Sequence, residues 1–227
     1  MKKGWKITLI IGFILLIGGG VSYAMGFNKD YFDYLGRKNY TGKFTSSIEG
    51  NDSYVLYKAR NQQFSIKLPK DFIILEETHG IGSDTHEIFN AAYWNPETKD
   101  NGKSIGRRLK VNYDLLPQEE VDIATKIALE TYSFENQYQK HETDDLILYT
   151  GESHTDASGM EVKRLDAKEY GTNTFFGFVL EKESNHSIEI GYSLICLEDD
   201  KEKCDYNEEL EREIFKNLIE SITFTGK

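Results

Sequence analysis

Apolar and polar residues alternate along many short stretches after residue 50, a period of two that is typical of strands with one buried face. The clearest stretch, Phe64–Leu68, stops at Pro69, which cannot donate a hydrogen bond to a neighbouring strand. The alternation predicts strands at Phe64–Leu68, Leu109–Leu115 and Ser187–Cys196, and strand-like apolar runs indicate others at Tyr54–Tyr57, Leu146–Thr150, Met160–Tyr170 and Thr174–Leu180. Because the four between Leu146 and Cys196 follow one another closely, separated by turns that bear Gly, Ser or Asn, they favour an antiparallel meander.

Two stretches have a helical pattern instead. Pro117 and the carboxylates that follow it are typical of a helix start, and this helix is expected to end near Tyr132. Near the C-terminus, Asp205–Glu208 resembles a capping box and precedes apolar residues spaced by four: Leu210, Ile214, Leu218 and Ile222. Strands in a run with helices at two places predict the α+β class, an antiparallel β-sheet flanked by helices. The region His79–Thr98 has no clear period.

The N-terminus predicts a transmembrane helix. Ile7–Phe27 has 21 residues without a charge, and a helix that crosses the hydrocarbon core needs about 20. Three of the six preceding residues are lysines, so the positive-inside rule places the N-terminus in the cytoplasm and the rest of the chain outside the cell membrane. We expect a single-pass anchor over residues 1–27, a juxtamembrane linker over residues 28–52 and an extracytoplasmic α+β domain over residues 53–227.

A cleaved signal peptide is the alternative to this anchor. Ser22-Tyr23-Ala24 resembles a cleavage site, and cleavage there would leave a chain that begins at Met25. Both interpretations export the domain. An N-terminal lipid anchor is not expected, since no cysteine precedes Cys196.

The charge of the exported part narrows the choice of partners. The chain has 27 Lys and Arg against 38 Asp and Glu; without the three anchor lysines the balance is 24 against 38, a net charge of −14. Such a field repels polyanions, so neither nucleic acid nor anionic lipid headgroups are expected partners. The acidity is typical of a soluble exported surface.

Cys196 and Cys204 are the only two cysteines, and the domain faces an oxidising compartment. A disulfide between them would close a short loop between the last strand and the last helix, and it would stabilise the domain by about 2–3 kcal/mol. The alternative is two separate thiols, with Cys196 buried as a small apolar residue.

Few residues suggest chemistry. The only dense group of metal-ligand types is His79, Asp84, His86 and Glu87, which is expected to be an exposed polar loop rather than a metal site, and no cofactor is expected. A hydrolase would use His86 or His154 as the base, with Asp84 or Asp156 nearby.

Several segments together resemble the Mog1/PsbP-like group. They are the opening strand with its proline, Phe64–Phe72, the meander, and the end of the closing helix, Ile219–Phe224. The resemblance spans roughly residues 54–225. It implies an antiparallel sheet flanked by helices and a non-catalytic binding or assembly module.

The leading hypothesis is therefore a non-enzymatic, membrane-anchored extracytoplasmic module that binds a protein or a component of the cell envelope. Tyr93 and Trp94 are the candidate contact residues, because aromatic residues on loops often anchor binding. The alternatives are an envelope-polymer hydrolase with a His/Asp pair, and an accessory subunit or sensor whose Gly18-Gly19-Gly20 segment packs on a membrane neighbour.

Overall fold

The computed structural model describes residues 36–82, 84–93, 105–156, 162–196 and 206–225, and from Arg37 onward these belong to one compact unit. None of the helices within those ranges is long and apolar enough to cross a membrane. The predicted span Ile7–Phe27 lies outside the described residues, as do Trp94 and Cys204.

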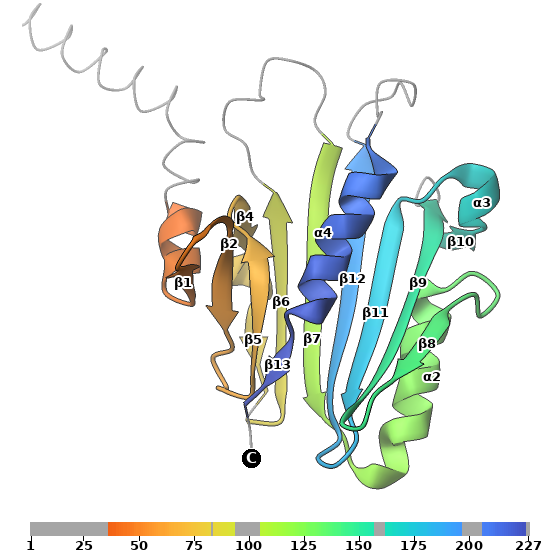
Figure 1. The fold of residues 1–227 in the computed structure, drawn as a ribbon, viewed down its shortest axis with the longest axis horizontal. Coiled ribbons are helices and arrows are strands. Elements are labelled where there is room, and N and C mark those ends of the chain that lie inside the picture. Colours follow the sequence, from red (N-terminus) through yellow and green to blue (C-terminus); the bar gives the residue numbers. More distant parts are fainter. Residues whose placement is uncertain (1–35, 83, 94–104, 157–161, 197–205, 226–227) are drawn as a thin grey trace, which may run out of the picture. The chain divides into compact units, whose positions relative to one another are not determined.

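A large antiparallel sheet carries the fold (Figure 1), with the strand order β10-β9-β11-β12-β7-β6-β4. Two further short strands extend it, β5 beside β6 and β8 beside β9. The bounds are β4 Phe72–Ile74, β5 Gly80–Ile81, β6 His86–Tyr93, β7 Ile105–Leu115, β8 Gln139–Glu142, β9 Leu146–Asp156, β10 Lys163–Leu165, β11 Thr174–Glu181 and β12 His186–Cys196.

A small antiparallel sheet with the order β1-β2-β3-β13 lies on one face of the large sheet, beside helix α4 (Figure 1). Helix α2 covers the other face. The bounds are β1 Thr45–Ile48, β2 Asn51–Lys58, β3 Phe64–Pro69, β13 Thr223–Phe224, α2 Val121–Tyr132, α3 Ala167–Tyr170, α4 Glu208–Glu220 and the 3₁₀ helices η1 Glu76–Thr78 and η3 Gln118–Glu120. Residues 36–42 form a further helix before β1.

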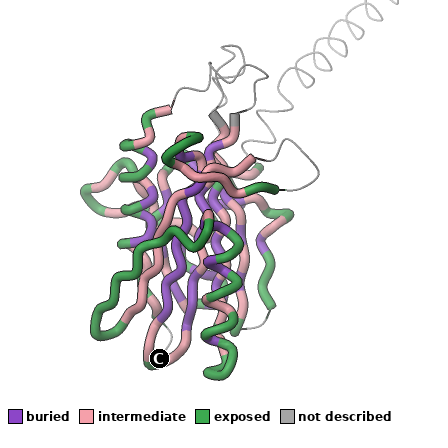
Figure 2. Tube along the Cα trace, turned by 90° about the vertical axis from the view of Figure 1, so that its right-hand side faces the viewer, coloured by how far each residue is buried: buried purple, intermediate pink, exposed green. Residues whose placement is uncertain are grey.

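The core lies on both faces of the large sheet, and Figure 2 shows the buried residues along the strands between more exposed helices and loops. The main core lies between this sheet and the layer of the small sheet and α4, and it includes Phe64, Phe89, Ile190 and Phe215. β11 is buried at seven of its eight positions because α4 packs on one of its faces and α2 on the other. The strand therefore has no polar face.

The predicted α+β class with antiparallel pairing is confirmed. The predicted strand Met160–Tyr170 is wrong over much of its length, because β10 covers only Lys163–Leu165 and residues 167–170 form α3. The Asp166 side chain accepts a hydrogen bond from the Lys168 amide, a capping contact that starts a helix where a strand was expected.

Three boundaries also differ from expectation. The strand predicted at Leu146–Thr150 continues to Asp156, and α4 is capped by Asn207, whose side chain accepts hydrogen bonds from the amides of Glu209 and Leu210. Residues 37–52, expected to be part of a linker, form the first helix and β1 of the compact unit.

Candidate functional site

A groove of about 790 Å³ lies between α4 and the edge of the large sheet at β8 and β9. Its floor is apolar and includes Leu148, Phe175, Phe215 and Ile219. Phe215 and Ile219 are four residues apart on α4 and so point to the same side of the helix. The groove can therefore accept an apolar group from a ligand.

Paired charges line the side of the groove. The Arg212 Nε atom lies 2.5 Å from Glu152 Oε1 and its Nη2 atom lies 2.9 Å from Oε2, while the Thr172 hydroxyl donates to Oε2 at 3.0 Å. The hydrogen bonds from Arg212 lower the pKa of Glu152, so this carboxylate is charged at neutral pH. Because both side chains are partly exposed, the pair contributes at most about 1 kcal/mol and a ligand can displace it at little cost.

The strand edge beside the groove is interrupted. β8 pairs with Ile147–Thr150 and β10 pairs with His154–Asp156, so among the described strands nothing pairs with Gly151–Ser153 on this edge. The chain itself covers this gap, because Ser153 is fully buried and its hydroxyl donates to the Tyr132 carbonyl oxygen, and the Gln137 carbonyl oxygen would lie 2.8 Å from a Cβ atom at Gly151.

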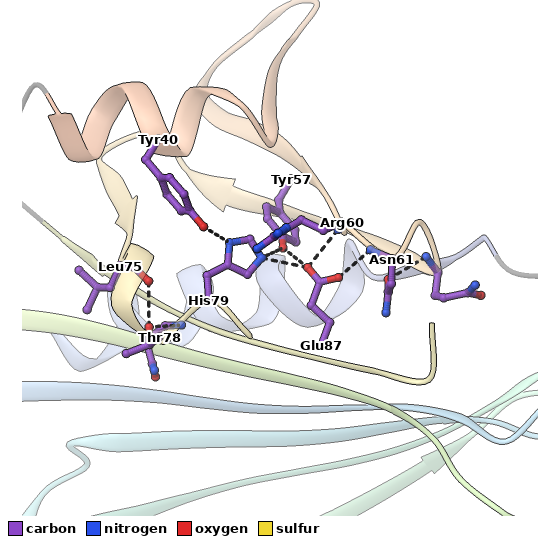
Figure 3. A network of polar contacts seen from close by, with 10 residues as sticks. Tyr40, Tyr57, Arg60, Asn61, Leu75, Thr78, His79 and Glu87 are labelled. Atoms are coloured by element: carbon purple, nitrogen blue, oxygen red, sulfur yellow. Dashed lines mark hydrogen bonds and ion pairs between the residues drawn. The ribbon is translucent and has the colours of Figure 1, made fainter. Parts of the chain in front are cut away.

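A second polar site is buried between the first helix, β2, β6 and the segment after η1, as Figure 3 shows. The Tyr40 hydroxyl lies 3.1 Å from His79 Nδ1, and the Tyr57 hydroxyl lies 3.1 Å from His79 Nε2. Glu87 Oε1 accepts from the Tyr57 hydroxyl and lies 3.1 Å from His79 Nε2. The cluster thus joins segments that are far apart in the sequence.

Burial and hydrogen bonding have opposite effects on Glu87. Burial by itself would raise the pKa of this carboxyl, but hydrogen bonds from the His79 ring, the Tyr57 hydroxyl and two backbone amides outweigh it, so the pKa lies below its ordinary value of 4.5. Burial also raises the pKa of Tyr57, and the neighbouring carboxylate raises it further, so this phenol stays a neutral donor. The side chains of His79 and Glu87 are 0% exposed, and no substrate can reach them in this conformation.

The structure separates the four residues that the sequence placed together as possible metal ligands. His79 and Glu87 are in the buried cluster, whereas His86 points to the opposite face of β6 and Asp84 is exposed. His86 Nδ1 lies 2.6 Å from Asp114 Oδ1, because these two residues are direct neighbours across β6 and β7. The expected pairing of His86 with Asp84 is therefore replaced by a cross-strand pair.

His154 has no acidic partner of this kind in the described residues and is bonded to a backbone carbonyl instead. Its Nδ1 atom lies 2.9 Å from the Gly171 carbonyl oxygen, and its ring lies 6.0 Å from the Tyr170 ring. These contacts tie β9 to the end of α3.

Tyr93, one of the two candidate contact residues, is partly buried. The Arg107 guanidinium lies 5.1 Å from the centre of the Tyr93 ring. It makes a bidentate pair with Glu211, in which Nε donates to Oε2 at 3.0 Å and Nη2 donates to Oε1 at 2.5 Å. Glu211 is 1% exposed and also accepts from the Tyr192 hydroxyl at 2.5 Å. The Tyr93 ring therefore covers an ion pair that attaches α4 to the large sheet.

The groove was not among the features predicted from the sequence. Its walls come from β8, β9, α3 and α4, which are distant in the sequence. One signal was available: because side chains of a strand alternate between its faces, extending the strand Leu146–Thr150 to Glu152 would have placed this carboxylate on the same face as Leu148.

Comparisons with known proteins identify one family. A family model described as "Putative lipoprotein YvcA" matches residues 37–223, and it confirms the resemblance to the Mog1/PsbP-like group. The crystal structure of the Saccharomyces cerevisiae Ran-binding protein Mog1p is similar at 8% identity with a TM-score of 0.41, over 75% of this chain and 94% of that chain. The structure of a point mutant of protein Mog1 is similar at 9% identity with a TM-score of 0.42, over 75% of this chain and 95% of that chain. No curated protein matches the chain.

Proposed function

The chain belongs to the YvcA_Mog1p family, and we propose that it is a membrane-attached, extracytoplasmic binding module that holds a protein partner in the groove between α4 and β9. The observation that carries this proposal is the contrast between two polar sites. The Tyr40, Tyr57, His79 and Glu87 cluster has the residue types of a catalytic centre but no access to solvent, whereas the groove is accessible and combines an apolar floor with paired charges. Such a lining favours binding over catalysis.

A protein partner fits this groove better than a small ligand. An extended segment could lie along the groove and place an apolar side chain against Leu148 and Phe215. The ion pair of Glu152 and Arg212 would then offer polar contacts at the rim.

We propose that Ile7–Phe27 attaches the protein to the membrane. The family description includes the word lipoprotein, but the first cysteine of this chain is Cys196, so the apolar segment takes the place of a lipidated cysteine. Intact-mass measurement of the membrane fraction tests this. The expected mass includes the N-terminal segment, and a mature chain that begins at Met25 would refute an uncleaved anchor.

The groove is tested by site-specific photocrosslinking in intact cells. A photoreactive phenylalanine at Thr150, in the groove wall, is expected to capture a defined partner, whereas the same group at the exposed Glu130 on α2 is not. The captured protein is then purified and titrated with the wild type, Thr150→Trp and Glu130→Trp.

Thr150→Trp fills the groove without altering its buried floor, so we expect it to weaken binding by at least about tenfold, or 1.4 kcal/mol, while Glu130→Trp has no effect. Equal capture at both positions, or equal affinity of both variants, would contradict the proposal. Tyr93 and Trp94 remain a second proposed contact, and loss of affinity in Trp94→Ala is its test.

A further inference from the structure

The acidic charge of this protein is unevenly distributed along the chain. Residues 36–70 contain two acidic residues, Glu49 and Asp52, and seven basic residues, a net charge of +5. Residues 71–227 contain 34 acidic and 16 basic residues, a net charge of −18. The net value therefore averages over two segments of opposite sign.

The basic segment forms the first helix and strands β1, β2 and β3. Lys58 and Lys67 share the outer face of the small sheet, because Lys67 is opposite Leu56 in the register and Lys58 follows Leu56 by two residues. The opposite face, with Tyr57 and Ile66, is fully buried. We define the basic face as the exposed side chains Lys43, Lys58, Arg60, Lys67 and Lys70.

Acidic residues border this face on two sides. Glu213 and Glu220 are exposed on α4, which packs beside β3, and Ser221, next to Glu220, accepts a hydrogen bond from the Lys67 amide. Glu49 and Asp52 lie at the turn between β1 and β2, Asp71 follows Lys70, and Glu76 and Glu77 belong to η1. Glu77 pairs with Arg37 at 3.3 Å. None of these residues lies between Lys58 and Lys67 in the register of β2 and β3.

The chain that precedes the basic segment is short. Nine residues, 28–36, connect the apolar segment to Arg37, and nine residues span at most about 30 Å when fully extended. If Ile7–Phe27 crosses the bilayer, this connection keeps the basic segment within about 30 Å of the membrane surface, so the segment can reach the anionic headgroups, whose attraction acts over about 10 Å.

We propose that the basic face docks on the anionic headgroups of the membrane to which the chain is attached. The inference rests on the proposed membrane attachment. It replaces the expectation of repulsion drawn from net charge, because the small sheet carries the positive part of that charge. The groove lies beside β8 and β9, at the other end of the large sheet from the small sheet (Figure 1), so docking leaves it accessible to a partner.

Lysine footprinting of the full chain in lipid nanodiscs tests the proposal. Discs are made of phosphatidylcholine alone or mixed with phosphatidylglycerol, and the acetylation rate of each lysine is read by mass spectrometry. We expect acetylation of Lys58 and Lys67 to slow about fivefold in the anionic discs. Lys126 on α2 and Lys216 on α4, both exposed, are the controls and should not change. At about 1 M salt the protection should disappear.

A charge-reversal pair provides the second measurement. Lys58→Glu with Lys67→Glu should abolish the lipid-dependent protection of Lys43 and Lys70, whereas the matched pair Lys126→Glu with Lys216→Glu should preserve it. Equal acetylation in the two lipids would overturn the proposal, and so would equal protection by soluble polyphosphate in phosphatidylcholine discs. A chain that does not float with the discs refutes membrane attachment instead, so the two failures are distinguishable.

Discussion

Glu87→Gln tests whether the buried carboxylate stabilises the fold. Glu87 Oε1 accepts from the Tyr57 hydroxyl and from the Arg60 amide at 3.1 Å, and Oε2 accepts from the Asn61 amide at 2.9 Å. His79 Nε2 lies 3.1 Å from Oε1. A glutamine has one acceptor oxygen and one NH₂ group, so in either orientation its NH₂ group faces at least one of these donors.

The cost follows from that mismatch. One buried donor without an acceptor costs about 1–3 kcal/mol, and the remaining hydrogen bonds lose the extra strength that a charged acceptor gives, about 1 kcal/mol each. The sum is about 3–5 kcal/mol, the range for breaking a buried charged network. For a domain of this size each kcal/mol lowers the Tm by about 2–4 °C, so we expect a decrease of roughly 6–20 °C.

The same carboxylate makes stability depend on pH. The pKa of Glu87 in the folded protein lies below its ordinary value of 4.5, so the unfolded chain takes up this proton first as the pH falls. The contribution of the ionised Glu87 to the free energy of unfolding is complete above the ordinary pKa of this group. It is lost as the pH falls through the lower pKa that the group has in the folded protein. The difference in Tm between wild type and Glu87→Gln should therefore be constant above about pH 5 and become smaller below it.

The assay is thermal unfolding of the full chain in detergent, followed by near-UV circular dichroism between pH 3 and 7. Glu189→Gln is the matched control. Its Oε1 atom accepts from Tyr132 at 3.1 Å and from Lys110 at 3.2 Å, the side chain is 18% exposed, and the expected loss is about 1 kcal/mol or less. Equal losses in the two variants, or an unchanged Tm in Glu87→Gln, would refute the reasoning.

Two further predictions concern the edge of the sheet and the cysteines. A Cβ atom at Gly151 would lie 2.3 Å from the Phe176 ring, so Gly151→Ala should cost about 1–3 kcal/mol in the same thermal unfolding assay, and an unchanged Tm would mean that the ring moves aside freely. If Cys196 and Cys204 are bridged, thiol titration of the denatured, unreduced protein should find no free sulfhydryl. Two reactive sulfhydryls would exclude the disulfide.

The strands that the sequence predicted well are those in which burial alone decides the pattern. In β12, Ile188, Ile190 and Tyr192 alternate with smaller or polar residues and all three are fully buried. β6 was not predicted because its inward position 87 is a glutamate. Hydrogen-bond donors from distant segments compensate the burial of this carboxylate, and a sequence pattern cannot show such donors.

The groove could be predicted from the sequence even less well than β6. The groove requires Leu148, Phe175 and Phe215 to converge, and each of them alone looks like an ordinary core residue in the sequence. The exposed polar loop expected for His79, Asp84, His86 and Glu87 is wrong for a simpler reason. His86 and Glu87 are adjacent in a strand and point to opposite faces of the sheet, so Glu87 is buried, as is His79.

The buried cluster also holds the first helix, 36–42, on the domain. Two contacts hold this helix on the domain. The Tyr40 hydroxyl lies 3.1 Å from His79 Nδ1, and the Ile74 amide donates to Thr41 Oγ1 at 2.9 Å. If this helix unfolded, the connection to the apolar segment would gain seven residues, up to about 25 Å of extended chain. The basic face would then no longer be held near the membrane. Glu87→Gln should therefore weaken the lipid-dependent protection of Lys58 under conditions in which the large sheet is still folded.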